Sequence, residues 1–200
     1  DLPDGERLHT LIGAIQSAGR HAADLTRQML TYAGRGRLAI QQVDLASAVR
    51  EMAQLLGASI PKKIALLLDL ADGLPTVEAD PAQLRQLVMN LVINATEAIG
   101  EREGRISVRT TAGESGDRFP ADLTLGRIEA GRHQVCVEIA DSGHGIAPEA
   151  LAKIFDPFFT TKFTGRGLGL AAVQGIVLRH GGTLAVRSAP GAGSTFRVCF

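Results

Sequence analysis

Residues 165–182 read GRGLGLAAVQGIVLRHGG, with three glycines in the first five positions and an apolar run of helical spacing after them. Because Gly165, Gly167 and Gly169 lack side chains, they leave backbone N–H groups exposed ahead of a helix. The N-terminal end of a helix carries partial positive charge, which favours a phosphate chain. Taken alone, however, the stretch is more simply interpreted as a glycine-rich loop without a ligand.

The residues just before these glycines, IFDPFFTTKF (154–163), combine adjacent aromatic side chains with a cation. Phe158 and Phe159 are candidates to anchor one end of a flexible flap. From such a flap, Lys162 or Arg166 could reach a terminal phosphate.

A strong helix is predicted over QLRQLVMNLVINATEAIG (83–100), where polar residues recur at spacings of four, four and three. This spacing places Gln86, Asn90, Asn94 and Glu97 on one side of the helix. Two carboxamides one turn apart are suited to a magnesium ion and the phosphate oxygens around it. On spacing alone, a solvated helix face is the simpler interpretation.

The stretch IADSGHGIAP (139–148) begins as a buried strand and then places an acid and two glycines in a turn. Asp141 can accept a hydrogen bond from an exocyclic amine, and Gly143 and Gly145 leave room for a flat ring. An ordinary Asx turn at Asp141 would explain the same residues.

Strand and helix patterns alternate through the rest of residues 37–200, which predicts an α/β sandwich with a mixed sheet and helices on one face. Asp44 and Asp80 are predicted helix N-caps, Pro81 suits a first helical position, and Gly100 ends the helix. The polar segment 113–132 is predicted to be an exposed loop. Strands are expected over 37–43, 62–70, 75–79, 104–112, 132–141, 182–189 and 194–200, and helices over 44–57, 80–100, from Pro148, and over 167–180.

The first 36 residues form a separate unit in this interpretation. Apolar residues between Leu8 and Tyr32 are separated alternately by three and four positions, a heptad seam that needs a partner helix. Gly34 and Gly36 are expected to form a hinge into the second domain, residues 37–200.

Composition argues against several functional classes. Lys and Arg together number 21, as do Asp and Glu, so neither nucleic acid nor a membrane surface is an expected partner. No apolar stretch approaches the ~20 residues that span a bilayer, and residues 1–20 lack the basic-then-apolar order that is typical of a signal peptide. Cys136 and Cys199 lie far apart in strand-like runs, so we expect buried, reduced cysteines in a cytoplasmic protein.

The order of these motifs resembles the catalytic and ATP-binding domain of sensor histidine kinases. The resemblance covers residues 37–200 and rests on five motifs, which are NLVINATEA (90–98), DSGHGI (141–146), FDPFFTTK (155–162), GRGLGLA (165–171) and GAGSTF (191–196). It implies the Bergerat fold, in which ATP lies between the helix that carries Asn90 and Asn94, two glycine boxes and a mobile lid. The first glycine box is DSGHGI (141–146) and the second is GRGLGLA (165–171).

The resemblance also implies a role for each matched residue. Asn90 would hold Mg²⁺, Asn94 would assist at the phosphates, and Asp141 would hold the adenine amino group. Thr195 would support Asp141 through water, and Gln86 is a candidate to orient the incoming histidine. The full ATP-binding set implied is Asn90, Asn94, Asp141, Gly143, Gly145, Ile146, Phe158, Thr161, Lys162, Gly165, Arg166, Gly167, Leu168, Gly169, Leu170 and Thr195.

The heptad helix resembles the second helix of the family's dimerisation and phosphoacceptor hairpin, which pairs with a second copy of the kinase. None of the five histidines is followed by Asp or Glu, the setting of a phosphoacceptor. The chain is therefore expected to be a fragment, with the acceptor histidine outside it and a response regulator as downstream partner.

Two departures from the family pattern affect the predicted site. Glu97 stands where many relatives have a basic residue, so it must face water or leave Lys162 and Arg166 to neutralise the phosphates. The lid between Lys162 and Gly165 is short, and we expect it to be disordered without nucleotide.

Two alternatives stay open at this point. ATP-hydrolysing relatives usually have a glutamate base four residues before the asparagine, and Gln86 in that position cannot act as a base near neutral pH. A degenerate fold used only for protein interaction is the second alternative.

Overall fold

The computed structural model describes residues 12–13, 38–57, 60–114, 119–127, 133–161 and 167–200. The predicted hinge and all but residues 12–13 of the predicted seam helix lie outside these ranges, and those two residues are helical. The proposed boundary at residue 36 therefore stays a prediction. No helix among the described residues is both long enough and apolar enough to cross a membrane.

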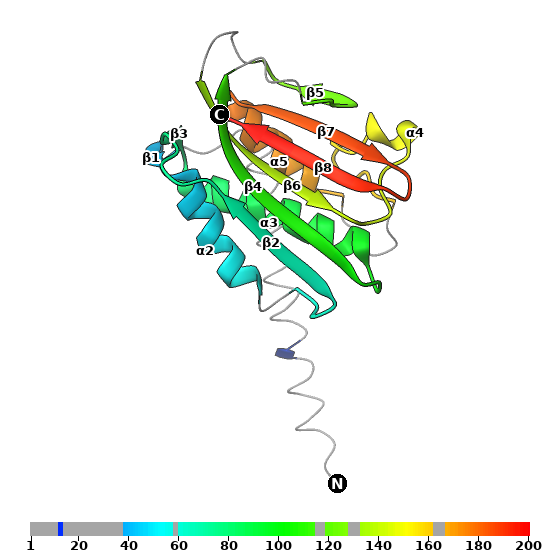
Figure 1. Ribbon diagram of the computed structural model, residues 1–200. Helices are drawn as coiled ribbons and strands as arrows, with labels where there is room; N and C mark the ends of the chain where they lie inside the picture. The colour runs from blue at the N-terminus through cyan, green and yellow to red at the C-terminus, as the bar shows by residue number, and fades with distance from the viewer. Residues whose placement is uncertain (1–11, 14–37, 58–59, 115–118, 128–132, 162–166) are drawn as a thin grey trace.

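A six-stranded mixed sheet forms the centre of the domain, in the order β2-β4-β6-β8-β7-β5 (Figure 1). β2 runs parallel to β4, and every other neighbouring pair is antiparallel. The mixed sheet predicted from the sequence is confirmed. The strands are β2 (Ile64–Leu70), β4 (Gly104–Glu114), β5 (Leu123–Leu125), β6 (His133–Asp141), β7 (Thr183–Ala189) and β8 (Gly193–Cys199), and β1 (Gln41–Val43) pairs with β3 (Val77–Ala79) in a separate ribbon.

Three helices cover one face of this sheet; Figure 1 shows α3 and α5 behind the strands and α2 beside β2. They are α2 (Leu45–Gly57), α3 (Pro81–Ile99) and α5 (Gly169–Arg179), while α4 (Pro148–Leu151) is a single turn after β6. Alternate residues of the strands face the helices, so Ile106 and Val108 of β4 and Ile139 of β6 are buried with Leu87 and Leu91 of α3. The core therefore lies between the sheet and α3.

Asp80, the predicted N-cap residue, caps α3 in the structure. The Asp80 carboxylate accepts hydrogen bonds from the N–H groups of Ala82 and Gln83 and also from Ala39, while Pro81 and Gly100 mark the two ends of α3. Burial raises the pKa of Asp80, but these three N–H donors and nearby His180 outweigh it and lower the pKa below the usual value. The hydrogen bonds to the ionised Asp80 carboxylate thus stabilise the start of α3.

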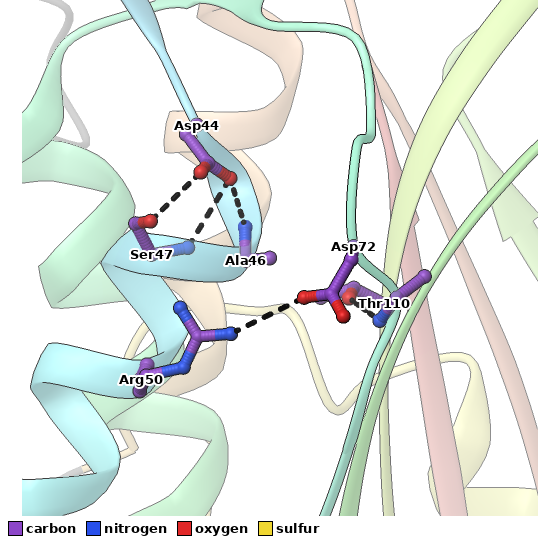
Figure 2. A network of polar contacts seen from close by, with 7 residues as sticks. Asp44, Ala46, Ser47, Arg50, Asp72 and Thr110 are labelled. Carbon is purple, nitrogen blue, oxygen red and sulfur yellow. Dashed lines mark hydrogen bonds and ion pairs between the residues drawn. The ribbon is translucent and has the colours of Figure 1, made fainter.

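The start of α2 is capped in the same way (Figure 2). The Asp44 carboxylate accepts hydrogen bonds from the Ser47 hydroxyl at 2.7 Å and from the Ala46 N–H at 2.9 Å, and the Ser47 bonds are the main reason that its pKa is lowered. About one turn further along α2, Nη2 of Arg50 lies 4.0 Å from Oδ1 of Asp72. This exposed pair contributes little to stability.

The segment 113–132 is not a loop throughout, which corrects the sequence prediction. Residues Leu123–Leu125 form β5 at the edge of the sheet, antiparallel to β7. Just before it, the Asp122 carboxylate accepts the Ser188 N–H at 2.8 Å, and the Phe119 ring lies 5.5 Å from the Arg187 guanidinium. β5 has only three residues, Leu-Thr-Leu, which is too short an alternation to be recognised within a polar segment, and its pairing with β7 defines it.

Cys136 and Cys199 form a disulfide, so the prediction of reduced cysteines is wrong. Cys136 on β6 pairs directly with Cys199 on β8, and their Cα atoms are 4.0 Å apart although 63 residues separate them in sequence. Spacing along the chain cannot reveal this contact because antiparallel pairing brings the two strands together.

Candidate nucleotide site

Two asparagines of α3 face the first residue of α5. The Asn90 side chain is buried, and its Nδ2 donates a hydrogen bond to the Gly169 carbonyl oxygen at 3.3 Å. Asn94 is one turn further along, and a Cβ added at Gly169 would lie 3.4 Å from its Nδ2. The interpretation of this helix side as a solvated face is therefore excluded for these two residues.

The Nδ2 atom of Asn94 is buried and donates to no acceptor among the described residues. A buried donor without a partner costs about 1–3 kcal/mol, so native structures seldom keep one without a functional reason. A phosphate oxygen placed between α3 and α5 would satisfy it.

The first turn of α5 provides further donors at the same place. Leu168 is the N-cap residue, and its side chain makes no capping hydrogen bond. The first N–H groups of an α-helix lack acceptors within the helix and lie at the positive end of its dipole. Gly169, Leu170 and the next residues therefore present amides beside Asn94, a suitable environment for an anion.

The Asp141 turn packs against the C-terminal end of the same helix, α3. The Asp141 carboxylate accepts the Gly143 N–H at 2.7 Å, so the Asx turn considered from the sequence is present. The His144 N–H donates to the Ala98 carbonyl oxygen at 3.1 Å, and a Cβ added at Gly143 would lie 2.7 Å from the Ala98 backbone. Since Ala98 is one turn beyond Asn94, α3 brings Asp141 and the asparagines into one region.

The β7–β8 hairpin closes the other side of the Asp141 turn. The Ile146 N–H donates to the Ser188 hydroxyl at 2.8 Å, and that oxygen lies 2.9 Å from the Ser194 hydroxyl. Ser194 pairs directly with Asp141 across β6 and β8. Sequence reasoning missed both serines because their role depends on strand register.

The role predicted for Thr195 is corrected by the same register. Thr195 pairs with Ala140, one position away from the pair formed by Asp141 and Ser194. Successive side chains on a strand point to opposite faces, so Thr195 faces away from the side that Asp141 and Ser194 share. Ser194 supplies the hydroxyl on the Asp141 side.

The FDPFFTTK motif contacts the second glycine box, GRGLGLA, through the backbone. The Phe158 N–H donates to the Gly167 carbonyl oxygen at 2.9 Å, and a Cβ added at Gly167 would lie 2.4 Å from the Phe158 carbonyl carbon. The Phe158 side chain is 61% exposed, whereas Phe159 is partly buried against the core. Phe159 therefore packs against the core and the Phe158 ring does not, while the flap that they were expected to anchor lies outside the described residues.

The other predicted positions are distributed around this region. Gln86 is half-buried on α3, one turn before Asn90, and Glu97 is exposed. Leu168 is buried, Leu170 is half-buried and Thr161 is exposed. Lys162, Gly165 and Arg166, together with the predicted disorder of the lid, fall outside the described residues.

The arrangement is suited to binding a polyphosphate and lacks the features of a metal cage built from acids or imidazoles. No group of three His, Cys, Asp or Glu side chains within the described ranges could hold a metal ion. A cation here would be held by a carboxamide oxygen and the ligand's own phosphates, as Mg²⁺ commonly is. Because the Asn90 Nδ2 bonds to Gly169, Oδ1 is the atom that Asn90 would offer.

Comparison with known proteins agrees with this geometry. Residues 79–200 match the family described as histidine kinase-, DNA gyrase B-, and HSP90-like ATPase. The sensor histidine kinase ZraS of Escherichia coli strain K12 is 39% identical over 195 residues, covering 97% of this chain and 38% of ZraS. The chain therefore spans well under half the length of this curated relative.

Solved structures share the same architecture. Full-length ShkA in complex with AMPPNP superposes with a TM-score of 0.76 at 28% identity, covering 100% of this chain and 39% of ShkA. The histidine kinase ThkA, in complex with the response regulator protein TrrA, superposes with a TM-score of 0.67 at 26% identity, covering 100% of this chain and 52% of ThkA. Both similarities extend over all elements of the sheet and the helices described above.

Proposed function

Because this chain belongs to the histidine kinase-, DNA gyrase B- and HSP90-like ATPase family, we propose that it is the ATP-binding catalytic module of a sensor histidine kinase. The module would position the γ-phosphoryl group of ATP for transfer to a histidine on a dimerisation domain. The observation that carries this proposal is the buried, unpartnered Asn94 Nδ2 beside the uncapped start of α5.

Different residues of the site would contact different parts of the nucleotide. The amides of residues 169–171 and Asn94 would hold phosphate oxygens, while Asp141 would accept a hydrogen bond from the adenine amino group. Asn90 would hold Mg²⁺ through Oδ1, and the ion would neutralise charge that develops on the phosphates. Lys162 and Arg166 would add positive charge from the lid.

Phosphoryl transfer fits this set because it depends mainly on positioning and charge stabilisation. The site contains carboxamides and backbone amides, and the nucleophile would be an imidazole nitrogen on another segment. Gln86 would orient that imidazole. The ThkA complex with a response regulator supports the same class of partner here, and the predicted seam of residues 8–32 supports pairing with a second copy.

A substitution at Asn94 tests nucleotide binding. Asn94→Ala should leave the melting temperature of the nucleotide-free domain unchanged or slightly raised, because it removes a buried donor that lacks a partner. It should weaken ADP–Mg²⁺ binding about tenfold or more, since phosphate contacts are charge-assisted. Thr96→Ala is the matched control, because the Thr96 hydroxyl donates to the Val92 carbonyl oxygen of its own helix.

Calorimetry with ADP and Mg²⁺ measures the affinities, and thermal denaturation measures the stabilities. If the wild-type chain binds no ADP at millimolar concentration, the domain is an interaction module and the proposal fails. Equal losses of affinity in both variants would also contradict a direct contact at Asn94.

Phosphoryl transfer needs a second experiment, in the full-length protein that contains this chain. Incubation with γ-labelled ATP should give a protein-bound label that is lost in acid and retained in alkali, as phosphohistidine is. Asn90→Ala should abolish the label. Rapid release of labelled phosphate without any labelled protein would favour the ATP-hydrolysing alternative.

A further inference from the structure

The turn of residues 141–146 is fixed on one side by the end of α3 and on the other by residues 188–194 of the β7–β8 hairpin. The His144 N–H donates to Ala98 on the helix side. On the hairpin side, the Gly191 N–H donates to the His144 carbonyl oxygen at 2.8 Å, and the Ile146 N–H donates to the Ser188 hydroxyl. Among the described residues of the hairpin, Ser188 is the one that makes these contacts with the turn through its side chain.

Backbone packs directly on backbone at this junction. A Cβ added at Gly145 would lie 2.0 Å from the Ala189 carbonyl oxygen, and one added at Gly193 would lie 1.9 Å from the Asp141 carbonyl oxygen. Both glycines have positive φ angles, of 70° and 81°. Since no side chain can enter this contact, the position of the hairpin determines the position of the Asp141 backbone.

The Ser188 hydroxyl occupies the centre of the junction. Its oxygen accepts the Ile146 N–H at 2.8 Å, its hydrogen is directed to the Gly193 carbonyl oxygen at 3.0 Å, and the Ser194 hydroxyl lies 2.9 Å away. A hydroxyl has one donor and two acceptor sites, so these three contacts use its full capacity if Ser194 donates. Its backbone N–H is held separately by Asp122.

We propose that Ser188 is a positioning residue for nucleotide base recognition. Through its hydroxyl it fixes the 141–146 turn against the hairpin, and it thereby orients the Asp141 carboxylate that would accept the adenine amino group. This inference rests on the proposed nucleotide-binding function and assigns to Ser188 no contact with the ligand. A substitution at Ser188 should therefore change how strongly the site prefers adenine over another base.

Ser188→Thr and Ser188→Val give a sharp comparison, because the two side chains have the same shape and differ in the hydroxyl. Adenine presents an amine to Asp141 where guanine presents a carbonyl, so Asp141 should favour ADP over GDP. In Ser188→Val we expect ADP–Mg²⁺ affinity to fall about fivefold, the effect of one lost hydrogen bond, and the ADP-to-GDP preference to narrow. Ser188→Thr should stay close to the wild type in both measurements.

Two further variants separate positioning from general stability. Thr183→Val, at the other end of β7, should leave both affinities unchanged. In an Asp141→Ala background, Ser188→Val should have no additional effect on ADP binding, because the two residues act through one contact. Equal losses for ADP and GDP, or a full additional loss in the Asp141→Ala background, would overturn the inference.

One measurement on the wild-type chain remains valid even if Ser188→Val does not fold. Addition of ADP should slow amide hydrogen exchange at Ile146 together with the rest of the 141–146 turn. Exchange at Ile146 that stays unchanged while ADP is bound would overturn the role of Ser188. A wild-type chain that binds neither nucleotide would instead overturn the proposed function, and the inference with it.

Discussion

The Asp80 backbone N–H donates a hydrogen bond to Nε2 of His180 at 3.0 Å, across 100 residues of sequence. His180 Nδ1 lies 2.7 Å from the Ile176 carbonyl oxygen, so the hydrogen of the neutral ring belongs on Nδ1. The ring also meets Phe200 edge-on, with centroids 6.0 Å apart. The start of α3 is thus joined to the end of α5, the two helices that hold the candidate site between them.

Replacement of His180 by Phe tests this connection. The ring contact with Phe200 would be retained, while the part-buried Asp80 N–H would lose its acceptor, so the free energy of unfolding should fall by about 1–3 kcal/mol. Urea denaturation at pH 7 measures the change. Leu178→Ala, on the exposed side of the same helix, is the control and should cost less. A loss in His180→Phe no larger than in the control would show that the hydrogen bond contributes nothing.

Asp80 gives a prediction about acid stability. Its folded-state pKa is lowered, so its stabilisation is fully present above the unfolded value of about 3.9 and is lost as the pH falls through the folded-state pKa. Asp80→Ala should therefore lower the free energy of unfolding by about 1–2 kcal/mol at pH 7, the usual cost of a lost N-cap. The difference from wild type should shrink below about pH 4. Urea titrations at several pH values measure it, and a difference that grows in acid would contradict the assignment.

Gly193→Ala tests the backbone contact between the hairpin and Asp141. The new methyl group would lie 1.9 Å from the Asp141 carbonyl oxygen, so the hairpin must move and the site should be disrupted. Gly191→Ala is a matched control, because Gly191 has a similar φ angle of 77° but no atom within 4 Å of an added Cβ. The control should cost about 1 kcal/mol from backbone strain alone. Thermal denaturation and ADP binding should both separate the two variants, and equal behaviour would exclude a packing role.

The Cys136–Cys199 disulfide predicts a dependence of stability on reductant. Without reductant, the unfolded protein should contain no alkylatable thiol, because the two cysteines are joined. Reduction should lower the free energy of unfolding by about 2–4 kcal/mol, as expected when a long loop is opened. Cys136→Ala/Cys199→Ala is the control, because its stability should not respond to reductant. Two reactive thiols in the untreated protein would contradict the disulfide.

Local chemistry was sufficient to predict most elements of the fold. Asp80, Pro81 and Gly100 mark the ends of α3 through side-chain and backbone preferences that need no distant partner, and the structure confirms them. β5 was missed because it is only three residues long and gains its hydrogen bonds from β7, whose nearest paired residue, Leu184, is 59 positions from Leu125. The exposure of the Phe158 ring was not predicted, because the backbone hydrogen bond from Phe158 to Gly167 joins two motifs that local patterns treat separately.

The sequence by itself determined which residues can bind a nucleotide, because carboxamides one turn apart, an acid at a strand end and glycines before a helix have these capacities in any fold. Only the tertiary structure decided which of them meet. Strand register placed Ser194 on the side of Asp141 and turned Thr195 away, and it joined two cysteines expected to be free. Register alternates faces at every residue, so a one-position difference that is nearly invisible in a motif decides which hydroxyl reaches the site.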